Sequence, residues 1–443
     1  MTEPVVSSEA AVTLIRPISP IRWRYTKQRA PWVMALFLFG IFVDYGGGFN
    51  FKLALTVLAL LWVLTRRVTP PIWAKAKWDI LVMLVIPGLL GALHVIATPT
   101  IGYGQGFVDL YGTLSSPLLL FLLPLVYLTG VHRSRRMVLM GMILVASAMI
   151  LVAGLHTAGI INLSDYSEWA STYRVGFIGI DPRQQGVLSN LRPLVSPRVG
   201  FTLVFGLGLA LSISWLWSGL IAIALIILNA RGMWFGALLA IGLWLVSKLL
   251  GGRFRFTRRG LLAVSIMIVV LATFFLATSV GSLLVNNVQA IIARFGEQMN
   301  AEDLSTQVRL GHLEGFGNLI ADRPLGILVG FGPSASLYNS AVDELYSGTE
   351  ISGLNIAMWY GVLYLILYLG WLFGAAGRLW MLRHRPGYTR EDTALVIGAV
   401  SFWLAANTNP LLTSPITVIA LMLIRVRILE LAGYHPRMAT KNG

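Results

Sequence analysis

Cysteine is absent from this chain of 443 residues, which excludes disulfide bonds, thiol nucleophiles and cysteine-ligated metal ions. Charge is also scarce: only 12% of the residues are charged, about half the share in a soluble domain. The sequence contains neither a G-x-x-x-x-G-K-[ST] phosphate loop nor a pair of histidines at metal-ligand spacing. We therefore expect any reaction at this chain to use no cofactor and no metal ion.

Hydrophobic residues are abundant instead, at 56% of the chain. Many fall in runs of about 17–25 residues, the length at which a helix crosses a bilayer. The sequence therefore predicts an all-α polytopic membrane protein with about twelve transmembrane helices. The predicted spans are 31–45, 51–65, 79–98, 111–129, 137–159, 199–214, 216–230, 232–250, 261–283, 353–379, 392–408 and 411–428.

The distribution of basic residues predicts the orientation of these helices. With a cytoplasmic N-terminus, 25 of the 34 lysines and arginines fall on the cytoplasmic side, and every loop on that side is basic. The net charge of +15 is thus explained by topology and by anionic lipid, so we expect no nucleic-acid partner. Both termini are predicted to be cytoplasmic.

Two long loops then face the periplasm. The predicted organisation is a basic cytoplasmic tail (1–30), N-terminal transmembrane helices (31–159), a periplasmic loop (160–198), central transmembrane helices (199–283), a large periplasmic catalytic loop (284–352), C-terminal transmembrane helices (353–428) and a cytoplasmic tail (429–443). The second loop includes an amphipathic stretch, 308–321. Its apolar residues at helical spacing are Leu310, Leu313, Phe316, Leu319 and Ile320. We expect it to form a short helix near the membrane surface, followed by turns at Pro324 and at the glycines 326, 330 and 332.

Nine basic residues remain on the outer side, and eight of them are arginines. A guanidinium group binds phosphate through two parallel hydrogen bonds and keeps its charge, so these arginines suit an anionic substrate. Pairing with acidic residues of the same loops is the alternative for each of them. That alternative is weaker for Arg198 and Arg231, because a cation where a loop meets a membrane helix requires a polar cavity or a lipid headgroup.

Glu350 is the most informative carboxylate, because it directly precedes an apolar run at the mouth of the predicted helical bundle. Burial there would raise its pKa and suit a general base. A first-turn acid that interacts with the helix dipole is the alternative reading. His312, on the predicted loop helix, is a second polar candidate, although histidine at such a position is more often a hydrogen-bonded or solvated residue.

The order of short motifs resembles the superfamily of O-antigen ligases and polymerases, which are integral membrane glycosyltransferases. The resemblance covers roughly residues 200–410. Its motifs are Asn229-Ala-Arg231-Gly232 at the start of a helix, Arg309 on a loop helix, Pro324-Leu-Gly326, Gly330-Phe-Gly332, and Glu350 eleven residues before Gly361. Two positions depart from the family pattern: Ala230 replaces a serine, and Ile351 separates Glu350 from Ser352.

The resemblance implies a GT-C-like fold in the inner membrane of a bacterium, with the active site on the periplasmic side. It also implies a polymerase of undecaprenyl-diphosphate-linked repeat units, which serve as donor and acceptor. Glu350, Arg309 and Arg231 would be catalytic in a metal-independent, inverting transfer. Arg198, Arg192, His312, Arg323 and Asn355 would bind the diphosphate or the glycan. A chain-length co-polymerase and a flippase are the expected protein partners, and membrane lipid surrounds the chain.

Two other functions stay open at this point. A glutamate at position 350 is similar to polymerases, whereas the ligases, which move finished glycan to lipid A core or to protein, have a histidine there. A flippase or transporter of lipid-linked sugars also uses about twelve helices, but such folds usually show internal repeats and charges in mid-helix.

Overall fold

The computed structural model describes residues 20–43, 51–66, 69–97, 110–160, 197–228, 231–250, 304–333, 335–346, 348–349, 351–407 and 411–433. Arg192 and Glu350 lie outside these ranges, as do the predicted span 261–283 and nearly all of the loop 160–198. For Arg198 and Arg231 only the backbone is described.

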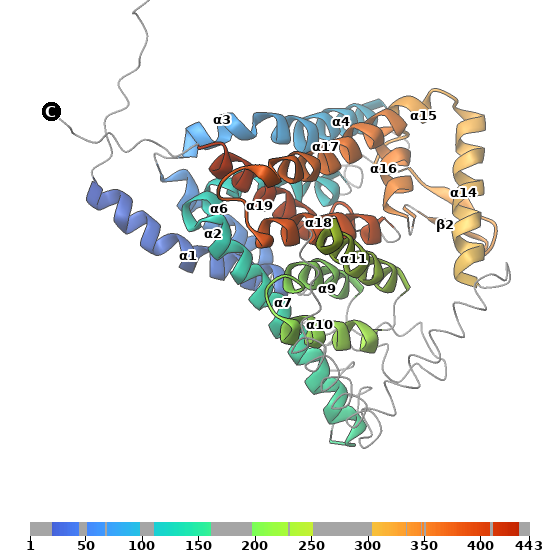
Figure 1. Ribbon diagram of the computed structural model, residues 1–443. Coiled ribbons are helices and arrows are strands. Elements are labelled where there is room, and N and C mark those ends of the chain that lie inside the picture. Colours follow the sequence, from blue (N-terminus) through green and yellow to red (C-terminus); the bar gives the residue numbers. More distant parts are fainter. Residues whose placement is uncertain are drawn as a thin grey trace, which may run out of the picture.

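The described part of the chain is mostly helical (Figure 1). The helices are α1 (Pro20–Val43), α2 (Phe51–Leu64), α3 (Thr69–Ile80), α4 (Ile86–Ala97), α6 (Leu123–Thr129), α7 (Val131–Thr157), α9 (Pro197–Ala210), α10 (Trp215–Leu228), α11 (Arg231–Leu250), α14 (Leu304–Asp322), α15 (Gly326–Val329), α16 (Ser352–Tyr360), α17 (Val362–Met381), α18 (Arg390–Ala406) and α19 (Pro415–Leu431). A π-helical turn (Leu81–Val85) joins α3 to α4, and a 3₁₀ helix (Pro117–Leu122) precedes α6. The strands β1 (Leu337–Asn339) and β2 (Glu344–Tyr346) form one antiparallel hairpin.

Five helical segments in the described part of the chain are long and apolar enough to cross a membrane. They are Ile72–Ala97, Leu110–Thr129, Val131–Leu155, Gly232–Leu249 and Val362–His384. Three shorter apolar helices accompany them: Arg29–Phe42, Leu53–Leu64 and Trp215–Ile227. The all-α membrane architecture is thus supported, whereas the number of twelve spans stays a prediction.

The centre of the bundle is formed by α9, α18 and α19, and most of the side chains described in these helices are buried. Two glycines let α9 and α18 approach closely. A Cβ added at Gly208 would overlap the backbone of Gly398, and one added at Gly398 would lie 2.8 Å from the carbonyl oxygen of Phe205. Small residues at such crossings allow the close helix packing that is typical of membrane proteins.

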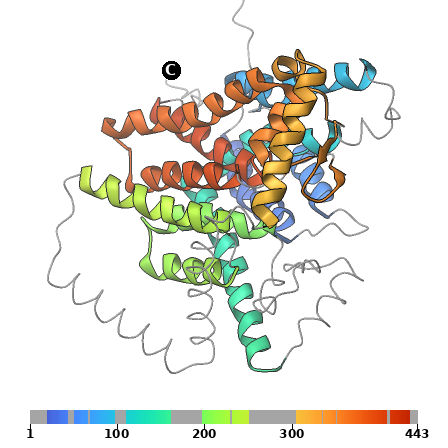
Figure 2. The same cartoon turned by 90° about the vertical axis from the view of Figure 1, so that its right-hand side faces the viewer.

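The predicted span 353–379 is not one continuous helix. It divides at Gly361, whose φ of +89° belongs to the left-handed region, into α16 and α17. Hydropathy could not reveal this break, because both parts are apolar. The helix predicted over 308–321 is present as α14, and it runs across the end of the bundle instead of along it (Figures 1 and 2).

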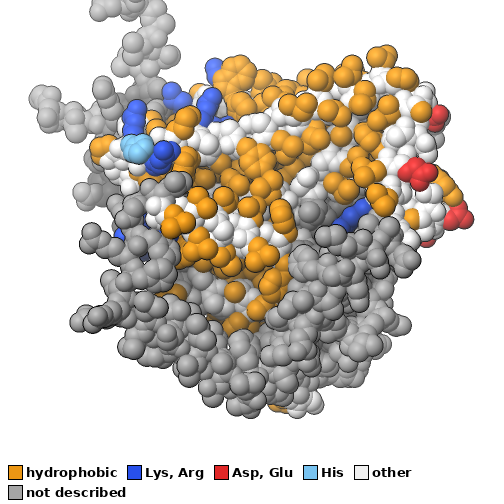
Figure 3. All heavy atoms as spheres, turned by 45° about the vertical axis from the view of Figure 1, so that its right-hand side comes forward, with side chains coloured by type: hydrophobic (Ala, Val, Ile, Leu, Met, Phe, Trp, Pro, Cys, Tyr) orange, Lys and Arg blue, Asp and Glu red, His pale blue; other side chains and the backbone are white. Residues whose placement is uncertain are grey.

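The two ends of the bundle differ in charge. One end carries α14, α15 and the hairpin, and we call it the α14 end. At the other end α7 and α18 begin and α19 finishes, and we call it the Arg135 end. On the face shown in Figure 3, acidic side chains gather near the α14 end, basic ones gather mostly at the opposite end, and hydrophobic side chains lie between them.

Buried ion pairs connect three helices at the Arg135 end. Arg427 of α19 binds both carboxylate oxygens of the fully buried Asp392, at 2.8 and 2.9 Å, and its Nη1 donates to Glu430 at 3.0 Å. The fully buried Arg135 of α7 pairs with Glu391. Because the backbone amide of Val131 also donates to Glu430, the network fixes the start of α7 to α18 and α19.

Candidate functional site at the α14 end

Two glycines seat α14 on the hairpin. Gly311 and Gly315 are four residues apart and therefore share one face of the helix. A Cβ at Gly311 would overlap the side-chain oxygen of Asn339, and one at Gly315 would overlap the carbonyl oxygen of Tyr338. The face that packs is thus this glycine face. Leu310 and Leu313, which the sequence assigned to the apolar face, are exposed.

His312 lies inside this contact and not on its surface. Its side chain is fully buried, and its ring packs edge-on against Tyr346 with the centroids 5.1 Å apart. Asn339 is equally buried; its Nδ2 donates to the carbonyl of Val308 at 2.8 Å, and its Oδ1 accepts from the amide of Ala341 at 3.0 Å. In this arrangement the imidazole helps to join helix and hairpin, while its part in binding substrate stays a prediction.

The Gly-x-Gly motif and Gly361 form one junction. The amides of Phe331 and Gly332 donate to the carbonyls of Met358 and Trp359, at 2.7 and 3.2 Å. A Cβ at Gly330 would overlap the backbone of Trp359, and one at Gly361 would overlap the backbone of Leu328. Two motifs that are thirty residues apart in sequence are therefore two sides of one backbone contact, which seats α15 against the end of α16.

The beginning of α16 is held by the turn that follows α18. The hydroxyl of Ser352 donates to the carbonyl of Ala406 at 2.9 Å and accepts from the amide of Leu412 at 3.0 Å. Asn407 accepts twice: its carbonyl from the amide of Ser352 at 3.1 Å, and its Oδ1 from the amide of Gly353 at 2.8 Å. The side chain of Asn407 thus satisfies a backbone amide that the first turn of a helix leaves without an intrahelical partner.

Asn355 fixes the residue just before position 350. Its Oδ1 accepts from the amide of Thr349, and its Nδ2 donates to the carbonyl of Thr349 at 2.7 Å. Both residues are buried. Since Ser352 is bound to the α18 turn, the chain is held on both sides of position 350. The amide of Asn355, predicted to bind substrate, is engaged in positioning this segment.

Helices α9, α11 and α18 each have one end at the α14 end of the bundle. A Cβ at Gly236 of α11 would lie 2.6 Å from the Cβ of Ala405 and 2.7 Å from a methyl group of Val204, so α11, α18 and α9 meet at one level. Arg231 precedes Gly236 by five residues, about 7.5 Å along the helix, and Arg198 precedes Val204 by six residues, about 9 Å. Figure 1 shows α9 and α11 beginning at the α14 end, where α18 finishes. The backbones of Arg198 and Arg231 therefore lie at the end that holds Ser352.

The two arginines of α14 and its following turn are far apart. Arg309 is partly buried in the second turn of α14, whereas Arg323 is exposed just beyond its last residue. Fourteen residues separate them, about 21 Å along a helix. The N-terminal end of α14 lies beside the N-terminal end of α11 in both views (Figures 1 and 2). Arg309 thus belongs to the half of α14 near Arg231, and Arg323 does not.

Sequence reasoning missed the positioning residues of this end. Gly311, Gly315 and Asn407 carry no chemistry of their own. The i, i+4 spacing of the two glycines was the available signal for close packing.

Comparison of the whole sequence with family models and with curated proteins finds no match. The geometry of the chain itself therefore carries the functional argument.

Proposed function

We propose that this chain is an integral membrane glycosyltransferase that polymerises undecaprenyl-diphosphate-linked oligosaccharide repeat units at the periplasmic face of the inner membrane. The α14 end is the periplasmic end in this proposal. The charge difference between the two ends supports this orientation, because cytoplasmic loops of membrane proteins are enriched in lysine and arginine.

One observation carries the proposal. The segments on both sides of Glu350 are clamped, and they are clamped at the end of the bundle where α9 and α11 begin with their arginines. A general base must be held within hydrogen-bond reach of the proton that it abstracts, so a rigid segment suits this role. Arginines at the start of neighbouring helices suit a diphosphate, because helix N-termini and guanidinium groups both attract phosphate.

The proposed chemistry follows from these roles. Glu350 accepts the proton of an acceptor sugar hydroxyl, whose oxygen attacks the anomeric carbon of the donor. The bond from that carbon to the diphosphate oxygen breaks, and Arg231 and Arg309 stabilise the charge that develops on the leaving diphosphate. Attack from the opposite side of the ring inverts the anomeric carbon. Arg198 and Arg192 are further arginines of the periplasmic side, and their proposed role is to bind the diphosphate or the glycan.

The test in cells uses Glu350→Gln and Arg309→Ala. Both changes should abolish long polymer while single lipid-linked repeats accumulate and the amount of protein in the membrane is unchanged. Glu344→Gln, on an exposed part of β2, is the matched control for the carboxylate change. Normal chain length in Glu350→Gln would remove that residue from the mechanism.

The carrier of the product separates the three functions that the sequence left open. A polymerase leaves long chains on undecaprenyl diphosphate. A ligase transfers glycan to a new carrier, and a flippase changes the side of the membrane on which the repeat is found without lengthening it.

A further inference from the structure

A basic cavity of about 750 Å³ opens at the Arg135 end, away from the proposed catalytic site. It lies between the first turns of α7, the turn after α9 and the start of α18. Its lining residues are His132, Arg133, Arg136, Ser212, Thr389, Arg390 and Glu391. The three segments are distant in sequence. The segments at the starts of α7 and α18 belong to loops that the basic-residue pattern assigns to the cytoplasm, and Ser212 lies near the cytoplasmic end of the predicted span 199–214.

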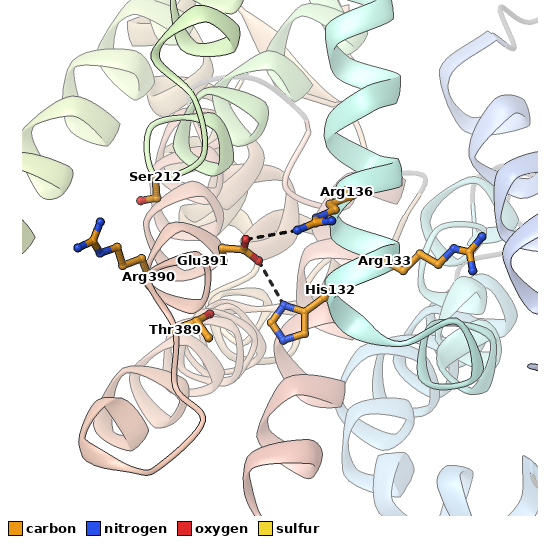
Figure 4. Close-up of a pocket in the computed structure, with 7 residues that line it drawn as sticks. All are labelled: His132, Arg133, Arg136, Ser212, Thr389, Arg390 and Glu391. Carbon is orange, nitrogen blue, oxygen red and sulfur yellow. Dashed lines mark hydrogen bonds and ion pairs between the residues drawn. The ribbon is translucent and has the colours of Figure 1, made fainter.

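Figure 4 shows how the charged groups are disposed. His132 and Arg136 point toward Glu391, with closest distances of 3.2 and 3.9 Å. Arg390 lies on the other side of Glu391, close to Ser212, and Arg133 points away from the cavity along the far side of α7. A group that enters the cavity therefore meets Arg136 on one side of Glu391, and Ser212 and Arg390 on the other side.

The carboxylate in the cavity does not balance these cations, because it already has a buried partner. Glu391 pairs with Arg135, whose side chain is fully buried behind the cavity wall. The other two carboxylates nearby, Asp392 and Glu430, are both bound by Arg427. The cavity and the network behind it thus contain five arginines and three carboxylates: Arg133, Arg135, Arg136, Arg390 and Arg427 against Glu391, Asp392 and Glu430.

The helix dipole of α7 adds to this positive field. Both α7 and α18 begin at the cavity, where the start of a helix carries about half of a positive charge, but the first turn of α18 contains Glu391 and Asp392 and is capped by Thr389. The first turn of α7 contains no acidic residue, although cations are favoured at the other end of a helix. Such an arrangement is stabilised by a bound anion.

Apolar surface continues from the cavity into the predicted membrane. Met140 and Leu144 lie one and two turns deeper on α7 than Arg136, and Trp215 and Leu216 follow the turn that holds Ser212. All four side chains are exposed, Trp215 to 70% and Leu144 to 64%. Tryptophan at the start of an apolar helix is typical of the headgroup level of a bilayer. A ligand with a phosphate and acyl chains fits this surface better than a soluble anion does.

We propose that this cavity binds the phosphate of an anionic phospholipid of the cytoplasmic leaflet, with Arg136 and Arg390 as its main ligands and the acyl chains along Met140, Leu144 and Leu216. Basic pockets between membrane helices on the cytoplasmic side suit such headgroups. The inference rests on the predicted orientation and is independent of the reaction proposed at the α14 end.

The experiment titrates phosphatidylglycerol into the purified full-length chain in detergent and counts bound lipid by native mass spectrometry. The variant is Arg136→Gln with Arg390→Gln. The matched control is Arg383→Gln with Arg385→Gln, which removes the same charge from exposed positions at the same end, outside the cavity. We expect the cavity variant to bind the first phosphatidylglycerol at least about tenfold more weakly, and the control to bind as the unaltered chain does.

Two further measurements identify the source of the phosphate and control for misfolding. Millimolar inorganic phosphate should not displace the lipid; complete displacement would assign the cavity to a soluble anion and overturn the proposal. If the control pair weakens phosphatidylglycerol binding by the same factor, the effect is one of surface charge alone, and the proposal is overturned. Should the glutamine pair fail to fold, Arg136→Lys with Arg390→Lys keeps the charge but loses the planar fork, and its affinity should be intermediate. Affinity unchanged in the lysine pair would contradict the guanidinium contacts.

Discussion

At the scale of single residues, the motifs of the α14 end are explained by backbone contacts as much as by chemistry. Gly330 and Gly361 both have positive φ angles, +87° and +89°, and each has no room for a Cβ because the backbone of the other's segment lies against it. Only glycine satisfies both conditions. Part of the resemblance to a glycosyltransferase superfamily therefore reflects how the segment after α14 is folded onto α16.

Gly361→Ala tests this explanation. The substitution adds a left-handed alanine and an overlap with Leu328, which together should cost at least about 2 kcal/mol of stability. The measurement is the thermal unfolding midpoint in detergent. Gly370→Ala in α17 is the control, because Gly370 is exposed, helical and has open space where a Cβ would lie. Its midpoint should be unchanged or higher; similar losses in both variants would contradict the role of Gly361.

Asn407 gives a second residue-scale prediction. Replacement by alanine removes the acceptor of the Gly353 amide and should destabilise the protein by about 1–3 kcal/mol. It should also lower polymer yield, because the segment that contains Glu350 loses one of its anchors. Asn407→Asp keeps an acceptor oxygen, and its negative charge suits the start of α16. Aspartate should therefore restore both readouts, and a failure of aspartate together with alanine would argue against the proposed anchor.

At the scale of elements, α14 shows what periodicity can and cannot predict. Apolar spacing located a helix over 308–321, and the structure has it as Leu304–Asp322. The face that packs was not predicted, because close packing onto a hairpin is achieved here by Gly311 and Gly315 and not by leucines. Hydropathy treats glycine as neutral, so it could not identify this face.

The span predicted from hydropathy also begins later than the helix α7 itself, again because contacts with other elements decide the local structure. Hydropathy placed the span at 137–159, whereas the helix begins at Val131. Its first turns are polar and basic, and they are helical because Glu391 and Glu430 bind Arg135 and the Val131 amide. These partners are some 260 to 300 residues away in sequence, beyond the reach of any local pattern.

Arg427 and Asp392 hold α18 and α19 together at this end, and their coupling can be measured. Arg427→Met alone leaves Asp392 buried without its bidentate partner and should cost about 3–5 kcal/mol. In a double-mutant cycle with Asp392→Asn, the loss in the double variant should be clearly smaller than the sum of the two single losses. Additive losses would show that the pair does not act as a unit. The stability losses of the single and double variants are measured from their unfolding midpoints, and the yield of folded protein is recorded for each.

At the scale of the whole molecule, composition and run length were sufficient to predict an all-α membrane protein, and five described helices are long and apolar enough to span. They could not tell which apolar helices face lipid. Helices α9, α18 and α19 have apolar sequences like those of the others, but most of their described side chains are buried in protein. For the site, the sequence named Arg231, Arg309 and Asn355; the positioning role of Asn355 and the buried place of His312 depend on tertiary contacts that no spacing encodes.

The orientation of the molecule can be tested directly because the chain contains no cysteine. Single cysteines are introduced at exposed positions, Glu344→Cys at the α14 end and Arg385→Cys at the Arg135 end. A membrane-impermeant maleimide should label the first in intact cells and the second only after lysis. The reverse pattern would invert the molecule and, with it, the face on which the reaction is proposed.

The most direct measurement is reconstitution of the purified chain in vesicles with a defined undecaprenyl-diphosphate-linked repeat unit and no other protein. We predict that the unaltered chain produces a ladder of longer glycans on the same lipid carrier, without added metal ion. Glu350→Gln, folded and inserted to the same extent, should leave the repeat unit at its starting length. A full ladder from Glu350→Gln would contradict the central claim that the carboxylate of Glu350 activates the incoming sugar while the arginines of α9, α11 and α14 bind the diphosphate.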